Sequence, residues 1–112
     1  MKTVEKKVLF KGFTSHEENV KKLKKTNPAA YKSLKNPDPK ACLAWNLIEI
    51  RNKKHLTQKE LSDKSGVSLR TINYIENLDY GYNATLDVIQ KVAKALGVSF
   101  RDLLQDVDLT ED

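Results

Sequence analysis

The sequence predicts an all-α fold built around one main domain. Helix-start signals recur along the chain, and the apolar residues between them are spaced three and four apart, as on one face of a helix. Strand-like alternation is confined to Val4 to Phe13, which is too short and too rich in lysine to predict a strand. A length of 112 residues fits a single domain with short appendages.

The helix starts are predicted by side chains that can cap the free amides of a first turn. Two segments fit the capping box, in which a hydroxyl and a glutamate three residues later each satisfy one backbone amide: Ser15 with Glu18, and Thr57 with Glu60. Ser99 and Asp102 form a weaker, acidic version. Other candidate caps stand directly before a proline or a helical pattern: Asn27, Asp38, Ser68 and Thr85.

Residues 1 to 40 are expected to form a basic extension with one or two short helices. The extension holds eleven lysines and four acidic residues, a net charge of +7. One helix is predicted from about Ser15 to Lys25, and the segment NPAAYKSL predicts another. The positive charge favours a polyanionic partner, although a solvated lysine-rich surface is the better explanation for KKLKK alone.

A core helix is predicted from about Pro39 to Lys54. One apolar face is expected on it, formed by Leu43, Ala44, Leu47, Ile48 and Ile50. Trp45 projects away from this face, so a second set of residues is needed to cover it, and Tyr31 and Leu34 are candidates. A partly exposed tryptophan with local packing is the alternative.

Two short helices that cross steeply are predicted from Thr57 to Ser65 and from Leu69 to Leu78. Gly66 can adopt the positive φ that ends the first helix, and Ser62 is small enough for close contact. Four apolar side chains are expected to converge between the helices: Leu61, Val67, Ile72 and Ile75.

The last core helix is predicted from Thr85 to Leu96 and ends at Gly97. Its apolar stripe is expected to consist of Leu86, Ile89, Ala93 and Leu96. The chain that follows has more apolar residues than a short closing helix needs: Phe100, Leu103, Leu104, Val107 and Leu109. Residues 106 to 112 are expected to form an acidic C-terminal tail.

The composition predicts a cytoplasmic protein without membrane spans, metal sites or cofactors. No stretch approaches the 18 or more apolar residues of a membrane span, and the N-terminus lacks a secretory signal. Cys42 is the only cysteine, and His16 and His55 lie far apart, so neither a disulfide nor a metal-ligand motif is present. Enzymatic activity is not expected, because no nucleophile and base, phosphate-binding loop or paired acidic motif stands at a recognisable spacing.

The segments TQKELSDKSGVSLRTINYIEN and TLDVIQKVAKALGVSFRDLL resemble the Cro and phage-repressor (XRE) family of helix-turn-helix domains. The resemblance covers about Ala41 to Leu104, and the main domain is taken as residues 41 to 105. It implies a compact five-helix domain that binds double-stranded operator DNA as a homodimer. The dimer contacts are expected between Val98 and Leu109, although Phe100 and Leu103 alternatively only close the core.

The resemblance implies a role for individual residues of the motif. The positions that match base-reading positions are Gln58, Ser68, Leu69, Arg70, Thr71 and Asn73. Phosphate contacts are expected from Arg51, Thr57, Lys59, Asn77 and Tyr82. Arg51 is also expected to form a structural ion pair with Glu76. Leu69 replaces the polar residue often found there, and either meets a thymine methyl or enters the core.

The extension ahead of the domain resembles HigA-type antitoxins, whose DNA-binding domain follows an N-terminal helical segment. This resemblance implies a small ribonuclease toxin as partner and a repressor of its own operon. A stand-alone phage-type or mobile-element regulator without a toxin partner is the alternative. Because such toxins are commonly basic, the +7 extension is a poor match for their surface.

Overall fold

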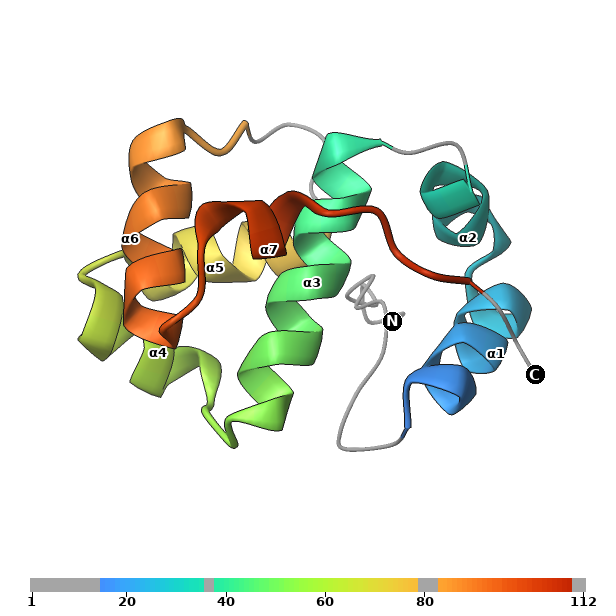
Figure 1. Ribbon diagram of the computed structural model, residues 1–112, viewed down its shortest axis with the longest axis horizontal. Coiled ribbons are helices and arrows are strands. Elements are labelled where there is room, and N and C mark those ends of the chain that lie inside the picture. Colours follow the sequence, from blue (N-terminus) through green and yellow to red (C-terminus); the bar gives the residue numbers. More distant parts are fainter. Residues whose placement is uncertain (1–14, 36–37, 79–82, 110–112) are drawn as a thin grey trace, which may run out of the picture.

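The computed structural model describes residues 15–35, 38–78 and 83–109, and these residues form seven helices and no strand. The all-α prediction is therefore confirmed, while Val4 to Phe13 lies outside the described residues. Figure 1 shows α3 in the middle, with α1 and α2 on one side and α4, α5 and α6 on the other. The helices are α1 (His16–Thr26), α2 (Pro28–Lys35), α3 (Pro39–Lys53), α4 (Gln58–Ser65), α5 (Leu69–Glu76), α6 (Leu86–Leu96) and α7 (Phe100–Leu104).

The predicted caps define the helix starts. In the box that opens α4, the Glu60 amide donates to Thr57 Oγ1 at 3.0 Å, and the Thr57 amide donates to Glu60 Oε1 at 2.9 Å. The same reciprocal arrangement opens α1 and α7. Single side-chain caps are confirmed at Asn27, Asp38, Ser68 and Thr85. Each cap stabilises its helix by about 1 kcal/mol.

Helix α3 is buried on both sides, so the prediction of one apolar face was wrong. Every residue from Ala41 to Ile48 is buried. Leu43 and Leu47 pack into the main cluster, which consists of Leu43, Leu47, Leu61, Val67, Ile72, Ile75, Ile89, Val92, Ala93, Leu96 and Leu103. Ala44 and Ile48 instead pack into the N-terminal cluster, which consists of Val20, Leu23, Ala30, Leu34, Ala41, Cys42, Ala44, Trp45, Ile48 and Leu78.

The N-terminal cluster covers Trp45. The indole is fully buried, Leu34 is buried beside it, and Tyr31 is partly buried against the same cluster. Both predicted covering residues are thus confirmed, and a partly exposed tryptophan is excluded. The buried, protonated state of Cys42 follows from the same packing, because burial raises the pKa of its thiol.

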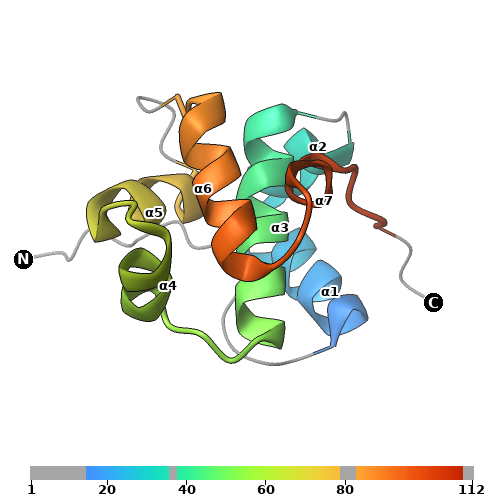
Figure 2. The same ribbon diagram turned by 60° about the vertical axis from the view of Figure 1, so that its left-hand side comes forward.

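The chain after α7 returns across α3 to α1, as Figures 1 and 2 show. We call residues 105–109 the C-terminal strap. Asn46 of α3 donates through Nδ2 to the carbonyl oxygens of Leu103, at 3.0 Å, and Gln105, at 2.8 Å. Val107 and Leu109 of the strap then pack against the N-terminal cluster. The strap therefore joins α3 to the two N-terminal helices.

Two further expectations about apolar residues are changed by the structure. Leu86 does not belong to the core stripe of α6, because this first residue of the helix is 71% exposed and Val92 takes its place in the main cluster. Helix α5 ends at Glu76 rather than at Leu78, whose φ of 53° turns its side chain into the N-terminal cluster. No helix in the described ranges has the length and apolar character needed to cross a bilayer.

Candidate nucleic-acid interface

Helices α4 and α5 are joined by a turn whose geometry matches the expectation. Gly66 ends α4 with a φ of +79°, a left-handed conformation that costs glycine little. The Gly66 amide donates to the carbonyl of Ser62 at 3.0 Å, and the Ser62 hydroxyl donates to the carbonyl of Val67 at 2.7 Å. The Ser62 side chain therefore stabilises the turn at the point where α4 and α5 cross.

The inner faces of the two helices are occupied by the apolar residues that the sequence predicts. Leu61, Val67, Ile72 and Ile75 are all buried in the main cluster. These four side chains account for the apolar packing between α4 and α5. Arg70, on the outer face of α5, is exposed and does not belong to this cluster.

The N-terminal end of α5 presents three exposed side chains: Ser68, Leu69 and Arg70. Leu69 is 42% exposed, so the alternative in which it enters the core is excluded. Ser68 caps the helix by accepting from the Thr71 amide at 3.1 Å, and its own hydroxyl donates to Thr71 Oγ1 at 2.8 Å. The cap therefore stabilises the start of the helix, where Arg70 lies.

Gln58 and Asn73 are joined by a hydrogen-bond network that the sequence did not reveal. Asn73 Nδ2 donates to Gln58 Oε1 at 3.1 Å, and Gln58 Nε2 donates to Glu76 Oε1 at 2.8 Å. At the other end, Asn77 Nδ2 donates to Asn73 Oδ1 at 2.7 Å. The spacing of Asn73 and Asn77, four residues apart across the end of α5, is a signal that could have indicated part of this network.

Arg51 connects the same network to α3. Its Nε donates to Glu76 Oε2 at 2.7 Å, its Nη2 donates to Glu76 Oε1 at 2.8 Å, and its Nη1 donates to the carbonyl of Leu56 at 2.7 Å. The Glu76 side chain is only 1% exposed. Three of the five guanidinium N–H groups are thus used within the protein, so most of the binding capacity of Arg51 serves the fold.

Of the remaining residues expected at phosphates, Thr57 directly precedes Gln58, and Asn77 belongs to the network through its hydrogen bond to Asn73. The Thr57 hydroxyl accepts from the Glu60 amide, which leaves its proton available to another acceptor. Asn77 Oδ1 is buried without a hydrogen-bond partner among the described residues. Tyr82 lies outside the described residues.

Exposed lysines flank α4 on the surface. Lys53 is the last residue of α3, Lys54 follows it, and Lys59 and Lys64 lie on α4. Lys59 forms an ion pair with Asp63 at 3.0 Å, with both side chains more than half exposed. Such a pair is weak in water and leaves the lysine able to exchange its partner for a phosphate.

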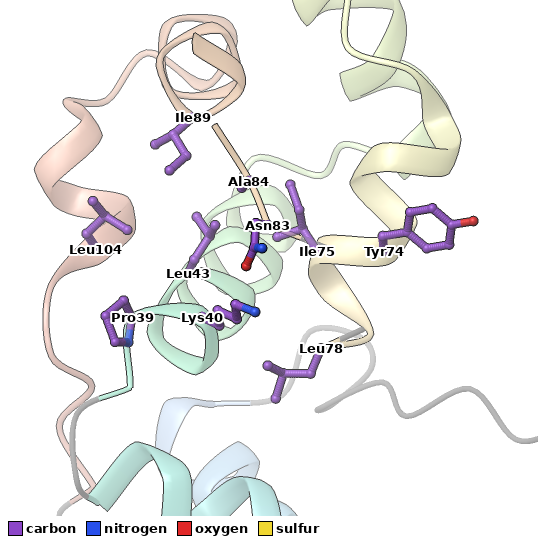
Figure 3. Close-up of a pocket in the computed structure, with 10 residues that line it drawn as sticks. All are labelled: Pro39, Lys40, Leu43, Tyr74, Ile75, Leu78, Asn83, Ala84, Ile89 and Leu104. Carbon is purple, nitrogen blue, oxygen red and sulfur yellow. The ribbon is translucent and has the colours of Figure 1, made fainter. Parts of the chain in front are cut away.

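A small apolar hollow of about 130 Å³ lies beside the C-terminal part of α5, between α3, α5 and the start of α6. Figure 3 shows that Leu43, Ile75 and Ile89 face one another there, whereas Tyr74 points away from the other labelled side chains. The described residues that line the hollow include no acid, histidine, serine or cysteine. Its titratable side chains are those of Lys40 and Tyr74.

Comparisons with known proteins place the site in a family. A sequence profile described as "Helix-turn-helix" matches residues 47–103, which include α4, the turn and α5. An uncharacterized HTH-type transcriptional regulator of Sinorhizobium fredii (strain NBRC 101917 / NGR234), y4dJ, is 34% identical over 74 residues, which cover 65% of this chain and 92% of that protein. No solved structure gives a significant match to the chain.

Proposed function

Because the chain belongs to the helix-turn-helix family of DNA-binding regulators, we propose that it is a sequence-specific transcriptional repressor that reads operator DNA with α5. The observation that carries the proposal is Arg70, which is exposed at the capped N-terminal end of α5 and takes no part in the core. An α-helix fits the major groove of B-DNA, where base edges differ from pair to pair.

The base-reading roles follow from the chemistry of each side chain. Arg70 can donate two hydrogen bonds to guanine, and Leu69 can contact a thymine methyl group. Ser68 and Thr71 can reach either kind of base edge from the same end of α5. Gln58 and Asn73 each donate one N–H within the protein, so we propose that they read bases through the second N–H of their amides.

The phosphate contacts are proposed for the residues that border α4 and α5. Thr57 offers its hydroxyl proton, Lys59 its ammonium group and Asn77 a side-chain N–H. Arg51 retains two N–H groups beyond those it donates to Glu76 and Leu56. These contacts set the register of the protein on the duplex, and Tyr82 is proposed to add a hydroxyl.

The substitution Arg70→Ala is expected to relax base preference at one position per half-site. The loss of a bidentate arginine contact should reduce discrimination at that position by roughly 1–3 kcal/mol. Affinities for a panel of single-base operator variants would measure the effect. Lys59→Ala is the control, because loss of a phosphate contact weakens all variants evenly and lowers the salt dependence. An unchanged preference profile for Arg70→Ala would refute the role of Arg70.

We further propose that the chain binds as a symmetric dimer, with two α5 helices in major grooves roughly 34 Å apart. Fewer residues between Val98 and Leu109 are available for a dimer interface than expected, because Leu103, Val107 and Leu109 pack within the chain. Phe100 remains 44% exposed beside a groove along α6 that Gln90, Lys94 and Val98 also line. In an antiparallel pair of α6 helices, Asp87 of one copy would face Lys94 of the other.

Phe100→Asp is expected to weaken the dimer by roughly tenfold or more, because burying an unpaired carboxylate in the contact costs more than about 1.4 kcal/mol. Sedimentation equilibrium would measure the dissociation constant. Leu69→Asp is the matched control, since it places the same charge at an exposed apolar residue on the reading end of α5. Equal dimer affinities for the two variants would show that Phe100 is outside the interface.

As the biological role, we propose an antitoxin that neutralises a small ribonuclease toxin and represses its own operon. The proposal is supported by the N-terminal helical segment, which resembles that of HigA-type antitoxins and here packs on α3. Co-expression with the adjacent reading frame would test it, and a stable complex with loss of ribonuclease activity is expected. Operator binding with no complex would instead favour a stand-alone regulator, and absence of both would refute the proposed function.

A further inference from the structure

His16 joins three segments that are far apart in the sequence. The residue begins α1, and its Nδ1 lies 2.7 Å from Glu49 Oε2 of α3. Its Nε2 lies 2.5 Å from the carbonyl oxygen of Asp108 in the C-terminal strap. The ring also meets the edge of Trp45 at 5.6 Å between centroids, with an angle of 83° between the planes. We call this set of contacts the His16 bridge.

The two oxygen contacts require one proton more than a neutral imidazole carries. A backbone carbonyl only accepts, so Nε2 must donate to Asp108. Nδ1 then has no hydrogen of its own in the neutral ring, whereas Glu49 is an acceptor when ionised. The extra proton resides on the stronger base, and imidazole is more basic than a carboxylate. The bridge is therefore complete when the His16 ring is a cation that donates from both nitrogens.

The surroundings of His16 favour this cation. Partial burial opposes the charge, but the hydrogen bonds to Glu49 and to the Asp108 carbonyl outweigh it, with further attraction from both carboxylates, and raise the pKa of His16 above its usual 6.5. Among the described residues, Glu49 of α3 and Asp108 of the strap are the acidic groups that face the ring from the elements packed against it. Glu49 is itself oriented by Trp45, whose Nε1 donates to Oε1 at 3.2 Å.

The bridge lies where the strap closes over the N-terminal cluster. Val107 and Leu109, on either side of Asp108, pack against that cluster, and Asn46 holds the opposite end of the strap through Gln105. His16 thus connects the first turn of α1 and the C-terminal strap to α3. When Nδ1 loses its hydrogen, the hydrogen bond to Glu49 is lost, and with it the link that ties the His16 ring and the strap segment bound to its Nε2 to α3.

We propose that protonation of His16 controls the docking of the C-terminal strap and α1 on α3, so that the closure of the N-terminal cluster responds to pH. The docked state is favoured while the ring is charged and is weakened when the ring loses its proton. Because binding of the proton is stronger in the folded chain, the stabilisation is complete below pH 6.5 and is lost as the pH rises through the raised pKa of His16.

Trp45, the single tryptophan of the chain, reports directly on this closure. As the pH rises from about 5.5 to about 9, the emission of the purified protein is expected to shift to longer wavelength and its quenching by acrylamide to increase. His16→Gln should abolish this pH-dependent step, and His55→Gln, at the exposed second histidine, should leave it intact. A step of equal size in His16→Gln, or none in the wild-type protein, would overturn the proposal.

The ionisation of His16 can be measured without any variant. Nitrogen-15 chemical shifts of the ring in the wild-type protein are expected to show both nitrogens protonated at pH 6.5, with a transition above that value. The backbone amides of the strap should lose protection from hydrogen exchange over the same transition. A neutral single tautomer at pH 6.5, or strap protection that does not follow the ring, would contradict the proposal even if His16→Gln fails to fold.

Discussion

Glu76→Ala is expected to lower the free energy of unfolding by roughly 3–5 kcal/mol, the range found when one partner of a buried ion pair is removed. The carboxylate is 1% exposed and accepts three hydrogen bonds, two from Arg51 and one from Gln58. Its removal leaves the Arg51 cation, which is 13% exposed, without its counter-charge. The loss also frees Gln58, and through it Asn73, to adopt other rotamers.

Urea unfolding followed by far-ultraviolet circular dichroism would measure this loss. Lys59→Ala is the matched control, because it breaks the exposed pair with Asp63 and is expected to cost at most about 1 kcal/mol. Comparable losses for the two variants would show that the Arg51 and Glu76 pair is no more important for stability than a surface pair.

Leu23→Ala is expected to destabilise the whole chain by about 2–5 kcal/mol, because it removes a fully buried side chain from the N-terminal cluster. Leu23 lies in α1, outside the residues that the family profile matches. A loss of this size requires that α1 and α2 unfold together with α3. The cluster provides the physical link, since Ala44, Trp45 and Ile48 of α3 belong to it.

The same substitution at Leu86 is the control for Leu23→Ala. Leu86 is 71% exposed, so Leu86→Ala should change the free energy of unfolding by no more than about 0.5 kcal/mol. Unfolding would be followed both by circular dichroism and by the emission of Trp45. A small loss for Leu23→Ala, with non-coincident transitions, would show that the N-terminal helices fold independently of the main domain.

Local signals allowed most of the helices to be predicted. A capping box such as Thr57 with Glu60 involves residues three apart, and Gly66 acts through its own backbone, so neither depends on the rest of the fold. The position of α3 could not be predicted in this way. Its second buried face exists only because α1, α2 and the strap pack there, and those contacts join distant segments.

The same distinction applies to the candidate interface. The exposure of Arg70 and the cap at Ser68 follow from the pattern of α5 alone. The engagement of Asn73 with Gln58 depends on the crossing of two helices, and its consequence, one committed N–H, changes how Asn73 can bind a base. Val107 and Leu109 were expected to be available for dimer contacts, but the path of the strap over α3 packs them, partly buried, against the N-terminal cluster.

Helix α5 contributes both to the stability of the protein and to the proposed recognition of DNA. Its inner residues, Ile72 and Ile75, complete the main cluster, while Glu76 at its end anchors the polar network. The network holds the side chains of Gln58 and Asn73, and the cap joins Ser68 to Thr71, without any DNA present. Such preorganisation lowers the entropic cost of binding, because fewer side chains must be ordered at the interface.

We propose that Arg70 and its neighbours at the start of α5 read a specific DNA sequence. This can be tested by selecting bound duplexes from a randomised pool with the purified full chain and sequencing them. We expect enrichment of an inverted repeat with half-sites about 10 base pairs apart, and loss of one preferred position per half-site with Arg70→Ala. Recovery of duplexes without a common sequence, or an identical motif for the wild-type protein and Arg70→Ala, would contradict it.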